Sequence, residues 1–203
     1  MVFVDLLAIQ LFVLGFAGLT LVYLTVDSVL LWRAGKNAGQ GIAAGQIPLA
    51  VIGVYMLVSG MFGQFTWPLP GSYNILFYDI YPIVGLFLIA AAWAVRQRMR
   101  LQYIGFFGLM LGLVTAFYGV TGYNLGLTLE PISILALYGL FGVTGVLGYP
   151  MTLMFDRSQA KIKNKSVLWV ALLVAFVAVT LIASLLAVYI GVSAVPGHLL
   201  SAP

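Results

Sequence analysis

Three carboxylates and the only histidine are the side chains best suited to chemistry: Asp5, Asp79, Glu130 and His198. Each lies near the edge of a long apolar run. Carboxylate oxygens with one imidazole can bind a divalent metal, and ionisable groups at membrane depth are candidates for binding protons or other cations. No short ligand spacing such as His-x-x-x-His accompanies them. The pattern predicts an ion or ligand site without identifying the ion, and whether the groups converge stays open.

A plainer interpretation of the same residues is structural. Asp79 precedes Pro82 by three residues and Glu130 precedes Pro131 directly. Proline is favoured in the first turn of a helix, where the helix dipole also favours negative charge. In this interpretation both carboxylates serve merely as helix caps, and His198 is a solvated residue of the tail.

Composition identifies the environment of these groups. Hydrophobic residues make up 63% of the 203 residues and charged residues 7%, against about 25% charged in soluble proteins. The chain is therefore expected to be one integral membrane domain, residues 1–203, and not to bind nucleic acid. The absence of cysteine excludes thiolate nucleophiles, iron–sulfur clusters and Cys-based zinc sites. No cofactor is predicted, and the metal stays unknown.

Six apolar runs are long enough to cross a hydrocarbon core of roughly 30 Å, which takes about 20 helical residues. They are continuous rather than alternating, which favours helices over a barrel. The first run has no basic leader and is too long for a signal-peptide core, so we expect it to be retained. The sequence predicts an all-α bundle with spans at about 6–32, 47–65, 75–95, 101–121, 132–151 and 167–190.

The nine basic residues predict the orientation of these spans. They follow the first, third and fifth runs: Arg33, Lys36, Arg96, Arg98, Arg100, Arg157, Lys161, Lys163 and Lys165. Basic connections remain in the cytoplasm. Both termini and the loops at 66–74 and 122–131 are therefore expected outside the cell membrane.

The outer loop reads TWPLPGSYN from Thr66 to Asn74. Its prolines exclude regular helix and should make Trp67 and Leu69 extended, and Gly71 should supply a turn. We expect a rigid loop at the headgroup level, with aromatic residues at the interface. The residues expected to form an interface there are Trp67, Pro68, Pro70 and Asn74.

Asp27 is a separate acid, six residues or about 9 Å of helix before Arg33. An unpaired charge in the inner half of a span is costly. Pairing with a loop arginine, a bond to Ser28 or a neighbouring span, protonation, and a proton relay all remain open.

Small residues recur in the fourth and fifth runs, where Gly108 and Gly112 form a GxxxG pair and Gly142 and Gly145 lie three apart. Such residues let helices approach closely, either within the bundle or against another chain. The second and third runs also resemble the fourth and fifth, which raises the possibility of a parallel repeat.

The TWPLPG segment, followed by Asn74-Ile75-Leu76-Phe77 and Asp79, resembles a family of uncharacterised multi-pass membrane proteins, mainly archaeal, catalogued as a domain of unknown function. The resemblance implies an archaeal cell membrane. It singles out Trp67, Pro68, Pro70, Asn74 and Asp79 as family features, and it implies no activity.

Three functions are compatible with these observations. The preferred one is a non-catalytic accessory or structural subunit that packs against other membrane chains or itself. The second is a small cation or proton transporter or channel that uses Asp79 and Glu130. The third is a metal-assisted membrane enzyme that uses Asp79, Glu130 and His198, although metal hydrolysis requires convergent ligands.

Overall fold

The structure is a computed structural model that describes residues 6–158 and 167–200, and these residues form helices joined by short connections. Six helices or helix pairs are long and apolar enough to cross a membrane, which confirms the six predicted spans. The helices are α1 (Leu6–Arg33), α2 (Gly39–Ala44), α3 (Gln46–Thr66), α4 (Ser72–Tyr78), α5 (Ile80–Arg96), α6 (Gln102–Asn124), α7 (Pro131–Ser158) and α8 (Val167–Leu200).

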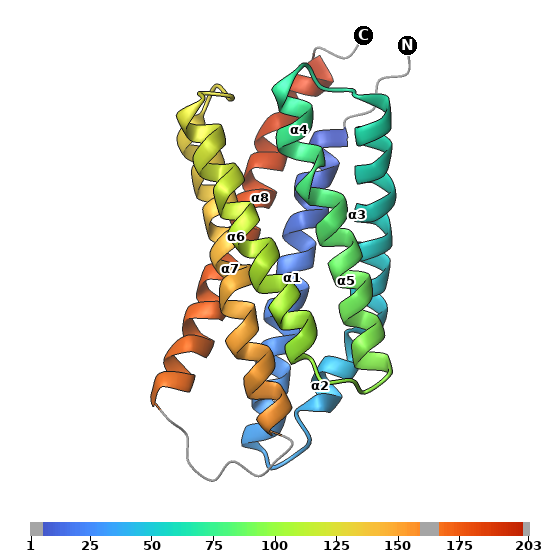
Figure 1. Cartoon of the computed structure of the whole chain (residues 1–203), viewed down its shortest axis with the longest axis vertical. Helices are drawn as coiled ribbons and strands as arrows, with labels where there is room; N and C mark the ends of the chain where they lie inside the picture. The colour runs from blue at the N-terminus through green and yellow to red at the C-terminus, as the bar shows by residue number, and fades with distance from the viewer. Residues whose placement is uncertain (1–5, 159–166, 201–203) are drawn as a thin grey trace.

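The long helices run up and down the bundle (Figure 1). The start of α1, the connections 67–71 and 125–130 and the end of α8 lie at one end, which we call the termini end. Arg33, Arg96 and the short helix α2 lie at the opposite end, which we call the basic end. Successive long helices run in opposite directions because each short connection is too short to cross the bundle. The next helix therefore begins at the end where the previous one stopped.

Two tight hairpins and one long pair make up the bundle. Helix α3 packs along α5, α6 packs along α7, and α1 packs along α8. In the first hairpin, a Cβ built on Gly53 would lie 2.7 Å from the carbonyl oxygen of Gly85. In the second, a Cβ built on Gly112 would lie 2.5 Å from the carbonyl oxygen of Gly142. Each hairpin thus needs glycine where two backbones meet.

The third span is broken within its first third rather than continuous. It begins at Ser72, and Asp79 separates α4 from α5. Pro82 lies in the first turn of α5 and has no N–H to donate to the carbonyl of Tyr78, so the helical hydrogen bonding is interrupted there. Asp79 therefore lies about two turns into the span and not at its beginning.

The backbone of Trp67 differs from the expected extended conformation. Its φ of 48° and ψ of 56° are left-handed, and its N–H donates to the carbonyl oxygen of Gly63 at 3.1 Å. This is how helices commonly end, because the left-handed residue satisfies a terminal carbonyl. Here closing α3 outweighs the preference that Pro68 imposes. Gly71, with φ of 51°, supplies the predicted turn.

Candidate functional site

Asp79 joins two spans through a hydrogen bond. Its carboxylate is half-buried at the junction of α4 and α5, and Oδ2 accepts a hydrogen bond from the Tyr118 hydroxyl of α6 at 2.9 Å. Although Asp79 directly precedes α5, its side chain makes no capping hydrogen bond. The carboxylate therefore ties the first hairpin to the second.

Glu130 has a different environment and different partners. It is exposed, directly precedes α7 as expected, and accepts a hydrogen bond from the Ser133 hydroxyl at 3.0 Å. Asp5 and the side chain of His198 lie outside the described residues. Among the residues described, no three His, Cys, Asp or Glu side chains group as metal ligands would. The convergence of Asp79, Glu130 and His198 therefore stays untested.

The loop at the termini end is held from inside by an amide. Asn74 is 1% exposed, its Nδ2 donates to the carbonyl oxygen of Gly63 at 3.2 Å, and its Oδ1 accepts from the N–H of Leu69 at 3.3 Å. Trp67, by contrast, is 52% exposed, and Pro68 and Pro70 are also exposed. The result is a loop with a fixed base and an open apolar surface.

Asp27 faces the short helix α2 at the basic end. The Asp27 side chain is half-buried, and a Cβ built on Gly41 would lie 2.8 Å from its Oδ2 and 2.8 Å from the Ser28 hydroxyl. Glycine at position 41 thus lets α2 lie directly on the carboxylate. One of the open alternatives, an ion pair with a loop arginine, is not among the contacts of the described side chains. The element that the structure places against the Asp27 carboxylate is α2.

Asp156 is a structural acid that the sequence analysis did not single out. Its two carboxylate oxygens accept hydrogen bonds at 2.9 Å from the N–H groups of Leu101 and Gln102, at the start of α6. A carboxylate is favoured at a helix N-terminus. The signal was hidden because Asp156 is 55 residues from Leu101, so no local capping pattern marks it.

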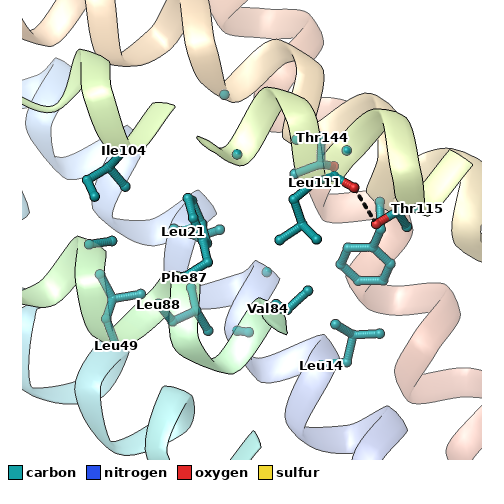
Figure 2. Close-up of a pocket in the computed structure, with 18 of the residues that line it drawn as sticks. Leu14, Leu21, Leu49, Val84, Phe87, Leu88, Ile104, Leu111, Thr115 and Thr144 are labelled. Atoms are coloured by element: carbon teal, nitrogen blue, oxygen red, sulfur yellow. Dashed lines mark hydrogen bonds between the residues drawn. The ribbon is translucent and has the colours of Figure 1, made fainter. Parts of the chain in front are cut away.

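The interior contains an apolar cavity of about 250 Å³ between the two hairpins. Figure 2 shows Leu111 of α6 and Val84 of α5 on opposite sides of it, with Leu14 and Leu21 of α1 beside them. Helices α1, α5, α6 and α7 supply most of the wall. Among the described residues that line it, none carries a charge.

A volume of 250 Å³ that the protein's own side chains do not fill is energetically significant. Atoms that line such a space lack partner atoms on one side and forgo dispersion contacts. An apolar occupant would offset that cost by restoring dispersion contacts.

The six spans and the apolar interior define the chain as a multi-pass helical membrane protein. A family model described as a protein of unknown function (DUF981) matches residues 1–201. The chain therefore belongs to the DUF981 family, which confirms the resemblance to an uncharacterised membrane protein family. No curated protein and no solved structure matches the chain.

Proposed function

We propose that this protein is a non-catalytic accessory or structural subunit of a membrane complex, and that it binds its partner through the loop at the termini end. The observation that supports this proposal is the contrast between Asn74 and Trp67. Asn74 is buried and hydrogen-bonded to both sides of the loop, whereas Trp67 is 52% exposed. A rigid loop loses little conformational entropy on binding, and tryptophan is enriched among the residues that dominate binding energy.

The engagement of the carboxylates supports the same proposal. Asp79 accepts a hydrogen bond from Tyr118, and Asp156 accepts two from the start of α6. These interactions hold spans together. A group that serves as a fixed link between helices is suited to a structural role.

The test is purification of the tagged protein from its native membrane in mild detergent, with mass-spectrometric identification of its partners. We expect a stoichiometric membrane protein with the unmodified chain and its loss with Trp67→Ala. The matched control is Trp93→Ala, because Trp93 is similarly exposed at 59% but lies on α5 toward the basic end. A partner retained by Trp67→Ala, or an unmodified chain that purifies alone, would refute the proposal.

The proposal includes a location and an orientation: the chain lies in an archaeal cell membrane with its basic end facing the cytoplasm. All nine Lys and Arg residues follow the first, third and fifth spans in the sequence. These three connections lie on the same side of a six-span protein, where the positive-inside rule applies to them together. The partner would therefore bind outside the cytoplasm.

A second candidate is a cation or proton transporter that uses Asp79 and Glu130. The favouring observation is the half-buried position of Asp79 inside a span, because ionisable groups at membrane depth commonly mark ion pathways. Purified protein in liposomes should then show cation or proton flux that Asp79→Asn and Glu130→Gln abolish. Flux that is unchanged in both variants would eliminate this site.

A further inference from the structure

The shape of the central cavity indicates the kind of molecule it can hold. Its lining on α1 extends from Leu7 to Thr25, about 27 Å or five helical turns. A compact cavity of about 250 Å³ would not contact residues five turns apart on one helix. The cavity is therefore long and narrow and runs along the bundle axis, as a single extended hydrocarbon chain does in a bilayer.

The wall offers an unused hydrogen-bond donor near one end. Gln10 lines the cavity, is 3% exposed, and its Nε2 has no hydrogen-bond partner. An unpaired buried amide is unfavourable, so the site favours a ligand that brings an acceptor oxygen. Of the lining threonines, Thr25, Thr115 and Thr152 donate to carbonyl oxygens of their own helices, and Thr144 accepts from Thr180. Tyr81 is a second lining residue whose buried hydroxyl has no hydrogen-bond partner.

The position of Gln10 matches the layout of a membrane lipid. Gln10 lies in the second turn of α1, about 6 Å from the start of the helix at Leu6. The rest of the cavity extends from there toward the basic end, where Val95 and Leu101 line it. A membrane lipid has its oxygen linkage at the edge of the hydrocarbon core and its chain inside the core. Gln10 and the apolar length of the cavity follow each other in the same order.

Helices α5 and α6 provide a route from the bilayer. They contact each other less than either contacts its hairpin partner, and both line the cavity. The rings of Phe87 and Phe107 meet edge to face across this seam, with centroids 6.0 Å apart. Side-chain rotation of two aromatic rings is a smaller change than the separation of glycine-packed helices, so a chain would enter here.

We propose that the central cavity binds one hydrocarbon chain of a membrane lipid, with the ester, ether or hydroxyl oxygen of that lipid accepting a hydrogen bond from Gln10. This site is independent of the loop at the termini end, so it stands or fails separately from the accessory-subunit proposal.

The probe is hexadecanol carrying a photoactivatable diazirine, added to the purified full chain in detergent, with labelled positions mapped by mass spectrometry. We expect labels on cavity residues of α1, α5 and α6, and we expect unlabelled hexadecanol to displace them in the unmodified protein. Val84→Phe should fill the cavity and reduce these labels at least about tenfold. Ile83→Phe is the matched control, because Ile83 is the neighbouring residue and is exposed on the outside of α5.

The role of Gln10 is tested by comparing the alcohol with the corresponding diazirine alkane, which has no oxygen. Gln10→Leu should weaken cavity labelling by the alcohol about five- to tenfold and leave labelling by the alkane unchanged. Equal loss of both probes would refute the hydrogen bond. Labels confined to the lipid-facing surface, or cavity labels that unlabelled hexadecanol does not displace, would overturn the proposal without reference to any variant.

Discussion

Buried and half-buried polar side chains in this protein connect segments that the apolar surfaces alone would leave free to slide. Asn74 joins the end of α3 to the loop that follows it, Asp79 joins the broken third span to α6, and Asp156 joins α7 to the start of α6. In a membrane, an apolar side chain makes similar contacts with lipid and with another helix. Hydrogen bonds between helices therefore contribute to specific association. Each of these three residues therefore fixes a position along its neighbouring helix.

Replacing Asn74 with alanine tests this role. The change removes two hydrogen bonds and leaves the carbonyl of Gly63 and the N–H of Leu69 without those partners. We expect a loss of about 1–3 kcal/mol of stability, measured by thermal or detergent-induced unfolding of the purified protein. Asn124→Ala is the control, because Asn124 is exposed at the end of α6 and its replacement should have little effect. Equal stability of the two variants would contradict the assignment.

At the scale of the helices, glycine determines how closely each hairpin closes. Gly53 and Gly85 meet in the first hairpin, and Gly112 and Gly142 meet in the second. Gly145 also lies against Gly112, whereas Gly108 faces the ring of Phe87 on α5. The recurring glycines of α6 and α7 thus lie largely within the bundle. The similar closure of the two hairpins is compatible with an internal repeat, which stays a hypothesis.

Gly112→Ala and Gly139→Ala form a matched pair for this argument. The new Cβ at position 112 would lie 2.5 Å from the carbonyl oxygen of Gly142, whereas a Cβ at position 139 would have no atom within 4 Å. We expect Gly112→Ala to lower stability by about 1–3 kcal/mol through overpacking, as measured by thermal unfolding in detergent. Gly139→Ala should be near neutral. A reversed order would show that α6 and α7 do not pack as described.

At the scale of the whole molecule, charge and apolar surface have separate roles. The basic residues of the described helices, such as Arg33 and Arg96, lie at one end, and the interior between the hairpins is apolar. The distribution of charge therefore predicts how the bundle is oriented in the membrane, whereas the packing of the helices determines what the bundle can enclose.

The chain contains no cysteine, so single cysteines can report its orientation without background. Ser72→Cys introduces one at the termini end and Ala34→Cys one at the basic end, both at exposed positions. A membrane-impermeant maleimide should label the first in intact cells and the second only after lysis. Labelling of Ala34→Cys in intact cells, with Ser72→Cys protected, would reverse the proposed orientation.

The sequence by itself determined the number, approximate limits and helical nature of the spans, because continuous apolar runs about 20 residues long have few other stable forms in a bilayer. It also predicted the turn at Gly71. These features depend on local composition and on backbone preferences of one or two residues.

Only the tertiary structure decided what the polar residues contact. The partners of Asp79 and Asp156 lie 39 and 55 residues away in the chain. The cavity at Gln10 exists because four helices leave a volume between their side chains. Such features arise from contacts between segments that are distant in the chain, so patterns among neighbouring residues do not predict them.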